Sequence, residues 1–357
     1  MPPLAVVEAS NAAFSPSYIP VAVFVGGTSG VGQAMAEALA RQTQGRAHII
    51  IVGRNTTAAA EILAGFPKPK PTEAEDGWTH EFVACEAKSM ASVRTVCAAL
   101  SARLKRINFL VITAGGPQAN SLTTSCLTSE GLNAKLAMRY FMRYLFTKEL
   151  LPLLGAAQEL GQHAHVMTVL GAGFGFPIRT TDLGLHEAHN RSIKFLQGLL
   201  PSAAAIKAHV TGFAYNDGLV AHFAAGHPAI AFTHILPGNV LTKGGSHIEL
   251  GWLFAPLAWV LGYIKRVFSF TQDECAQYML YGLLDTEPAR GVFIRGQLGD
   301  VVSSHVFTGH EVQFDATSPT ANKTGVLHGV RMKGYGGSDA SVAGLIAYTE
   351  KVLSAIP

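Results

Sequence analysis

The sequence predicts an α/β fold in which a doubly wound parallel sheet carries helices on both faces. Short apolar runs alternate with longer segments of helical periodicity between residues 21 and 300, which is the order expected of strand–helix–strand units. The runs are apolar throughout, as is typical of parallel strands that are buried on both faces. A glycine-rich turn joins the first run to the first helical segment.

The individual elements follow from these patterns. The predicted strands are apolar runs bounded by turn residues, and they span residues 21–25, 48–55, 81–85, 107–116, 164–173, 229–238 and 291–297. The predicted helices carry Ala, Leu and other apolar residues at helical spacing, and they span residues 33–42, 89–104, 134–154, 212–226 and 340–353.

The 357 residues divide into three parts. A leader of residues 1–20, punctuated by Pro and Ser, precedes the sheet domain of residues 21–300. Within that domain, an enlarged apolar lid is expected at about residues 243–270. Beyond residue 301 the alternation fades, and residues 301–357 are expected to be a C-terminal extension packed on the same domain.

Composition excludes several classes of protein. Hydrophobic residues make up 48% of the chain and charged residues 14%, so the chain is expected to be ordered and rich in core. A net charge of +3 without a dense basic run predicts no nucleic-acid partner. The four scattered cysteines predict buried thiols in a reducing compartment, and the absence of a secretory signal predicts a cytoplasmic protein. The cysteines are Cys85, Cys97, Cys126 and Cys275.

The glycine-rich turn predicts a nucleotide site. Gly26, Gly30 and Gly32 follow a predicted strand and open a helix, which is the context that a dinucleotide fingerprint requires. Glycines allow the backbone to approach a pyrophosphate closely, and the helix N-terminus supplies amide donors and a positive dipole end.

The end of the second strand indicates which dinucleotide binds. Arg54 stands where an NAD site typically has an acidic residue, and a guanidinium accommodates the 2′-phosphate of NADP. Ser29 or Asn55 would assist at the phosphate. The alternative is that Arg54 is a solvated loop residue.

Four segments in this order, "GGTSGVG", "VGRN", "TAGG" and "LPGNVLT", resemble the short-chain dehydrogenase/reductase superfamily. The chain is similar to divergent fungal oxidoreductases of that superfamily, including those of secondary metabolism. The resemblance implies a Rossmann-like sheet and a nicotinamide cofactor, here NADP(H). In the family pattern TGxxxGxG, Val25 replaces the Thr.

The resemblance also implies the residues that hold the cofactor. The glycine turn takes the pyrophosphate, Glu86 lies near the adenine, and the segment from Pro237 to Thr242 holds the nicotinamide. Thr113 precedes the Ala114–Gly115 pair that stands for the end of the family's Asn-Ala-Gly motif. The predicted cofactor residues are Gly26, Thr28, Ser29, Gly30, Val31, Gly32, Arg54, Asn55, Glu86, Ala114, Gly115, Pro237, Gly238, Val240 and Thr242.

The family's Asn-Ser-Tyr-Lys tetrad is substituted. Counting from the "LPG" and "LLPLL" segments, the Asn, Ser, Tyr and Lys positions fall on Arg139, Leu170, Lys207 and Thr211. One literal YxxxK occurs as Tyr144 and Lys148. It lies on the helix that should carry the Asn, so we interpret it as an interfacial Tyr and a solvated Lys.

The predicted catalytic residues are therefore substitutes. Arg139 and Arg143 share a helical face, from which a guanidinium could polarise a carbonyl or hold an acidic group. Tyr140 is a nearby phenol, Lys207 could donate a proton if burial lowers its pKa, and His209 is a further alternative. The histidine pairs lack partners at ligand spacing, so no metal site is predicted.

The segment after the nicotinamide-binding residues indicates the substrate. Residues 250–264 form an apolar run with Pro256 inside it, too short for a membrane span. This run predicts a lid over a small apolar substrate, with peripheral membrane contact or a homo-oligomer contact as alternatives. Residues 174–204 lengthen the connection before the Tyr position and are expected to remodel the mouth of the pocket.

These observations favour an NADP(H)-dependent oxidoreductase that reduces a carbonyl or oxidises an alcohol on a hydrophobic small molecule. Two alternatives stay open because the tetrad is substituted. One is a redox-neutral cyclase or isomerase on the same scaffold. The other is a catalytically inactive NADP-binding sensor or scaffold.

Overall fold

A computed structural model describes residues 3–68, 79–115, 126–172, 174, 178–186, 203–241, 269–284, 291–295 and 339–356. Its strands form one parallel, seven-stranded sheet in the order β3-β2-β1-β4-β5-β6-β7. The strands are β1 (Val21–Val25), β2 (His48–Gly53), β3 (Glu81–Ala84), β4 (Phe109–Ile112), β5 (His165–Val169), β6 (Ala231–Ile235) and β7 (Gly291–Arg295). The direction of the strand order reverses between β1 and β4, so this junction is the topological switch point of the sheet.

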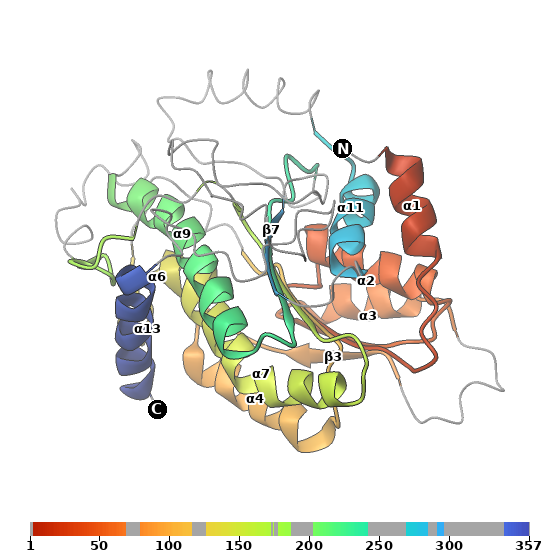
Figure 1. Ribbon diagram of the computed structural model, residues 1–357, viewed down its shortest axis with the longest axis horizontal. Coiled ribbons are helices and arrows are strands. Elements are labelled where there is room, and N and C mark those ends of the chain that lie inside the picture. Colours follow the sequence, from red (N-terminus) through yellow and green to blue (C-terminus); the bar gives the residue numbers. More distant parts are fainter. Residues whose placement is uncertain are drawn as a thin grey trace, which may run out of the picture.

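Helices cover both faces of the sheet (Figure 1). One layer, here called the α2 face, contains α1 (Leu4–Ala12), α2 (Gly30–Gln42), α3 (Thr56–Ala64) and α11 (Gln272–Leu284). The other layer, the α9 face, contains α4 (Met90–Arg103), α6 (Ala134–Leu136), the π-helical turn η2 (Ala137–Phe141), α7 (Met142–Glu159), α9 (Ala203–Gly226) and α13 (Asp339–Ser354). This single parallel sheet, with a layer of helices on each face, confirms the predicted fold class.

The apolar strand runs are explained by burial on both faces. Along β1, Val21, Val23 and Val25 pack into the core of the α9 face, while Ala22 and Phe24 pack into the core of the α2 face. Alternate strand residues point to opposite faces, so a strand between two helical layers has no side that favours polar residues. Each predicted strand is confirmed in position.

Both ends of the described chain carry helices that complete the layers. The predicted C-terminal helix is confirmed as α13, whose Leu345 and Leu353 are buried in the core of the α9 face. The leader contains a helix that the sequence pattern did not predict, α1, and Asn11 of α1 donates to the backbone oxygen of Gln277 in α11 at 2.9 Å. Helices α3 and α11 were also not predicted.

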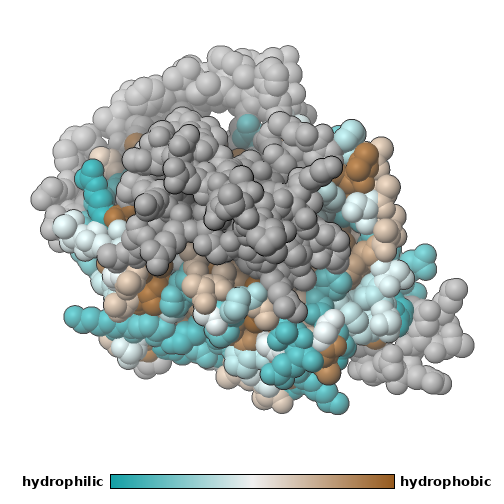
Figure 2. All heavy atoms as spheres, viewed as in Figure 1, coloured by the Kyte–Doolittle hydropathy of each residue, from teal (hydrophilic) through white to brown (hydrophobic). Residues whose placement is uncertain are grey.

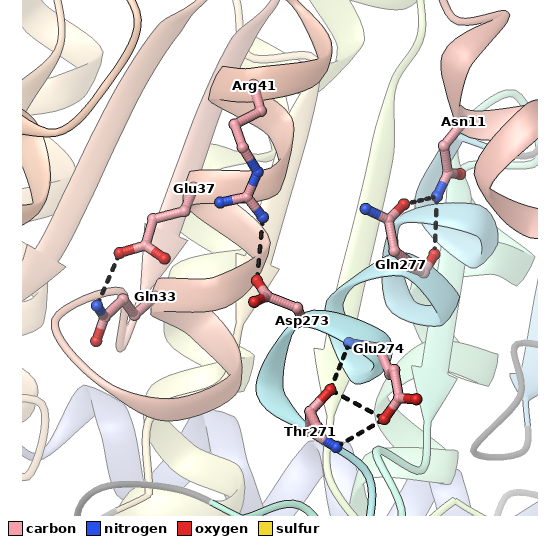
Figure 3. A network of polar contacts seen from close by, with 8 residues as sticks. All are labelled: Asn11, Gln33, Glu37, Arg41, Thr271, Asp273, Glu274 and Gln277. Carbon is pink, nitrogen blue, oxygen red and sulfur yellow. Dashed lines mark hydrogen bonds and ion pairs between the residues drawn. The ribbon is translucent and has the colours of Figure 1, made fainter. Parts of the chain in front are cut away.

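Polar contacts join α11 to its neighbours on the α2 face (Figure 3). Thr271 and Glu274 form a reciprocal capping box at the start of α11: the Glu274 carboxylate accepts from the Thr271 amide, and the Thr271 hydroxyl accepts from the Glu274 amide. Arg41 of α2 forms an ion pair of 3.1 Å with Asp273. The helix that opens at the glycine turn is thereby attached to α11.

One of the four cysteines, all expected to be buried, is exposed in the structure. Cys85, Cys97 and Cys275 are buried as predicted, but Cys126 is exposed because it lies in a loop before α6.

Over the described part of the face in Figure 2, hydrophobic and hydrophilic residues are intermixed. Among the helices that are described, none is long and apolar enough to cross a bilayer. The predicted lid segment of residues 250–264 lies outside the described residues.

Candidate functional site

The glycine turn after β1 is seated directly on the carboxyl end of β4. Gly26 has φ of 95°, and a Cβ there would lie 2.5 Å from the backbone nitrogen of Ala114. A Cβ on Gly32 would lie 2.3 Å from the Thr113 hydroxyl oxygen and 2.5 Å from the carbonyl oxygen of Gly26. These distances exclude any side chain, so two of the three predicted glycines are required by the close approach of turn and strand.

The residues predicted to bind the adenine ribose lie together at the ends of β2 and β3. An Arg54 guanidinium nitrogen lies 3.5 Å from a Glu86 carboxylate oxygen, and the two side chains are 60% and 44% exposed. Asn55 has a structural task as well, because its side chain accepts a hydrogen bond of 3.0 Å from the Ala58 amide and caps α3. Thr28 packs against Gly53 at the end of β2.

The segment after β6 forms a turn that contacts Phe270 and α11. Gly238 has φ of 73°, a conformation that favours glycine. Val240 is buried and pairs with Phe270: the Leu241 amide donates to the Phe270 carbonyl at 3.0 Å. The Pro237 carbonyl oxygen accepts a hydrogen bond from the Cys275 thiol of α11. Thr242, also predicted to hold the nicotinamide, lies outside the described residues.

Two guanidinium groups lie at the carboxyl ends of the strands on the α9 face. Arg139, in the π-helical turn η2, is 4% exposed, and Arg143, in the first turn of α7, is 0% exposed. Arg139 donates to His209 of α9 at 2.8 Å and lies over the Phe213 ring. Burial lowers the pKa of each guanidinium to about 9, and for Arg143 the charge of Arg139 adds to this effect. Both groups remain protonated at neutral pH.

Arg143 connects two strand ends. Its guanidinium donates to the Ile112 carbonyl at 2.9 Å, to the Ala114 carbonyl at 3.1 Å, and to the Thr168 hydroxyl of β5. The Thr168 hydroxyl in turn donates to the Asn216 side-chain oxygen of α9 at 2.8 Å. Arg143 therefore fixes the Ala114 segment on which the glycine turn is seated.

Sequence reasoning missed four buried polar residues on β5, β6 and α9. Thr168, Asn216, Asp217 and His234 are all buried, and His234 Nδ1 lies 2.6 Å from an Asp217 carboxylate oxygen. In the sequence these residues stand out as polar positions inside otherwise apolar segments, most clearly the Asn-Asp pair in the middle of α9. Buried polar groups of this kind need partners, and this requirement would have selected them.

Two further predicted catalytic residues, Lys207 and Tyr140, have partners outside the group around Arg143. Lys207 is exposed on the first turn of α9 and pairs with Asp182 at 3.4 Å, so it lacks the burial that the hypothesis required. Tyr140 is fully buried, and its hydroxyl lies 2.8 Å from the Thr349 hydroxyl of α13. Burial raises the pKa of Tyr140 far above its usual value. In the described structure the polar atoms of both residues thus have partners on other segments of the chain.

The literal YxxxK pair on α7 faces the C-terminal helix. The Tyr144 hydroxyl donates to the Glu350 carboxylate, and the Lys148 ammonium donates to the same group at 2.6 Å. The two residues do share one helical face, but this face packs against α13 and not against the strand ends. The structure thus supports the interfacial interpretation of this pair.

Comparison with known proteins decides the family. The model for short chain dehydrogenases matches residues 20–172. The oxidoreductase andH of Emericella variicolor is 31% identical over 79% of this chain and 74% of its own length. The chain belongs to the short-chain dehydrogenase family. An oxidoreductase of Emericella nidulans is 32% identical over 78% of this chain and 76% of its own length.

More distant relatives share the same family fold. The human polyprenol dehydrogenase is 25% identical over 88% of both chains. A solved short-chain dehydrogenase from Streptomyces avermitilis superposes with a TM-score of 0.53 at 19% identity, covering 79% of this chain and 89% of its own. As a short-chain dehydrogenase, this chain is an oxidoreductase with a site for a nicotinamide cofactor.

Proposed function

We propose that this short-chain dehydrogenase uses NADP(H) to interconvert a carbonyl and an alcohol on a small hydrophobic molecule. The observation that carries the choice of NADP is Arg54 at the end of β2, an exposed cation that forms, among the described residues, a 3.5 Å ion pair with Glu86. A 2′-phosphate can replace such a loose partner, because it offers a guanidinium two strong acceptors.

Two observations support a hydrophobic substrate. Residues 250–264, beyond the described part of the chain, are apolar and follow the segment predicted to hold the nicotinamide. The human relative is named for polyprenol, an apolar alcohol. A setting in secondary metabolism, a contact with a membrane surface and a homo-oligomeric state stay predictions.

A redox-neutral reaction is the second candidate. It is favoured by the positions of Tyr140 and Lys207, whose polar atoms are engaged by Thr349 and Asp182. A hydride transfer to a carbonyl needs an acid within hydrogen-bond reach of the developing alkoxide. A cyclase or isomerase would instead use the pocket for orientation and electrostatic stabilisation.

The decisive test combines cofactor absorbance with product mass. Purified protein is incubated with NADPH and a panel of long-chain and aromatic ketones. Oxidation of NADPH together with a product heavier by two hydrogens supports the reductase. A product of unchanged mass with NADPH intact supports the redox-neutral reaction. Tight NADPH binding without conversion across the panel favours a sensor.

The NADP preference is tested by Arg54→Asp. This substitution removes the cation and places a carboxylate beside the 2′-phosphate, so we expect NADPH affinity to fall at least about tenfold, the effect of roughly 1.4 kcal/mol. NADH, which lacks that phosphate, is the internal control and should bind as before. Titration by cofactor fluorescence measures both. Equal changes for NADPH and NADH would contradict the assignment of Arg54.

A further inference from the structure

We infer that Arg143, Thr168 and Asn216 are positioning residues of the dinucleotide site: they hold the chain after β4 in the place that the glycine turn requires. The inference rests on the proposed binding of a dinucleotide at this turn. It adds two residues that no sequence motif selected, and it gives Arg143 a task other than polarising a carbonyl.

The first step is the contact between the glycine turn and the residues after β4. The Val25 carbonyl accepts from the amides of Thr113 at 2.8 Å and of Ala114 at 3.0 Å. The Thr113 hydroxyl donates to the Gly26 carbonyl at 3.3 Å. Because no side chain lies between the Gly26 backbone and Ala114, a displacement of Ala114 passes directly to the turn.

The second step is the end of the ladder between β4 and β5. Its last paired residues are Ile112 and Thr168, so the ladder stops before Ala114. Past this point the Arg143 guanidinium provides the connection. It donates to the carbonyls of Ile112 at 2.9 Å and Ala114 at 3.1 Å, and the Thr168 hydroxyl is its third acceptor. One planar group thus fixes Ala114 relative to β5.

The third step is the orientation of the Thr168 hydroxyl. The Asn216 amide nitrogen lies 2.5 Å from the Arg139 carbonyl oxygen and 2.6 Å from the Gly212 carbonyl oxygen, so it donates to both. The side-chain oxygen of Asn216 therefore faces Thr168, whose hydroxyl must donate to it, at 2.8 Å. The lone pairs of this hydroxyl are then left for the Arg143 guanidinium.

The fourth step is the cost of breaking this chain of hydrogen bonds. The side chains of Arg143, Thr168 and Asn216 are all buried. Loss of the Thr168 hydroxyl would leave an N–H of Arg143 and the side-chain oxygen of Asn216 buried without a partner, which is more costly than the loss of an exposed hydrogen bond. A shift of the guanidinium toward another acceptor relieves this cost, and such a shift moves Ala114.

The consequence concerns cofactor affinity. The glycine turn would serve NADPH and NADH alike, so a displaced turn should weaken both cofactors by the same factor. Arg54 differs in this respect, because its proposed contact is with the 2′-phosphate that only NADPH carries.

The test compares Thr168→Val with Thr168→Ser in the full-length protein. Valine keeps the shape of threonine without the hydroxyl, whereas serine keeps the hydroxyl. Dissociation constants for NADPH and NADH are measured by fluorescence and calorimetry, under conditions in which urea denaturation shows each variant to be folded. We expect Thr168→Val to weaken both cofactors equally, by about tenfold, and Thr168→Ser to stay within about threefold of the unsubstituted protein.

Controls separate this role from a loss of packing. Thr147→Val is the matched control, because Thr147 is also fully buried but donates within its own helix, to the Arg143 carbonyl at 2.8 Å. It should leave both affinities unchanged. If Thr168→Val does not fold, Arg143→Lys takes its place: an ammonium cannot reproduce the planar contacts to both carbonyls and the hydroxyl, so both affinities should fall together.

Three results would overturn the inference: unchanged affinities in folded Thr168→Val, a loss confined to NADPH, or an equal loss in Thr147→Val. An unsubstituted protein that binds neither dinucleotide would overturn the proposed function as well. Failure of the NADP assignment alone is recognised separately, as an equal effect of Arg54→Asp on the two cofactors.

Discussion

The two faces of the sheet differ in how deeply their charged side chains are buried. On the α2 face, the ion pair of α11 lies at the surface, with the Arg41 and Asp273 side chains 51% and 77% exposed, and the buried polar residues Asn11 and His165 hydrogen-bond to α11. On the α9 face, Arg143, Asn216 and the Asp217–His234 pair are 0% exposed. The Arg41–Asp273 pair of the α2 face thus remains in solvent, whereas the Arg143 guanidinium and the Asp217–His234 pair of the α9 face are removed from it.

The difference is informative because buried polar groups are expensive. Their removal from water costs several kcal/mol per ion unless excellent partners are present. Arg143, Thr168 and His234 lie near the carboxyl ends of β4 to β6, the edge at which open α/β sheets bind their ligands. The buried charged groups of the α9 face are therefore expected to matter more for stability than the exposed ion pair of the α2 face. The following predictions test this contrast.

The largest effect is expected at the buried pair on the α9 face. His234→Ala leaves the Asp217 carboxylate buried without its partner, and we expect the free energy of unfolding to fall by about 3–5 kcal/mol. Urea denaturation measures the loss. The matched control is the double variant Asp217→Leu/His234→Leu, which removes both polar groups and should recover most of the stability. A loss below about 1 kcal/mol for His234→Ala would show that this pair is not a costly buried group.

A smaller effect with a defined pH dependence is expected at α13. Burial alone would raise the pKa of Glu350, but hydrogen bonds from Lys148 and Tyr144 outweigh it and lower the pKa below its usual value of 4.5. A lowered carboxylate pKa stabilises the folded protein above the pKa of the unfolded state, and this contribution disappears as the pH falls through the folded pKa. Thermal unfolding at pH 7 and pH 3 should show a loss that Glu350→Gln lacks. Parallel curves for both proteins would contradict this assignment.

The smallest effect is expected on the α2 face. Arg41→Ala removes an exposed ion pair with Asp273, and we expect a change of less than about 1 kcal/mol in the free energy of unfolding. The change should shrink further at 1 M salt, because exposed charges are screened. The same urea denaturation provides the measurement. A loss comparable to that of His234→Ala would remove the contrast between the two faces.

Local signals explain how much of the fold could be predicted. The strands are continuous apolar runs, and the glycine turn requires Gly26 and Gly32 for reasons that lie within a short stretch of chain and one neighbouring strand. Helix α1 was missed because nine residues without a side-chain cap carry little periodic signal. What stabilises α1 is its packing on α11, far away in the sequence.

The candidate site was only partly predictable for a related reason. The bonds from Arg143 to Thr168 and from Thr168 to Asn216 join residues that lie 25 and 48 positions apart. Counting along the chain selected Arg139 and Lys207 alike, but burial distinguishes them, since one is 4% exposed and the other lies in solvent. Burial is a property of the packed helices and cannot be counted from a motif.

The position of α13 has a consequence for the way the chain is synthesised. Lys148 of α7 precedes Glu350 by 202 residues. At a translation rate of about 5–20 residues per second, α7 leaves the ribosome roughly 10 to 40 seconds before the helix that covers it. During this interval the nascent chain exposes the apolar surface that later receives Leu345 and Leu353. A molecular chaperone that shields such surfaces would have its period of greatest benefit then.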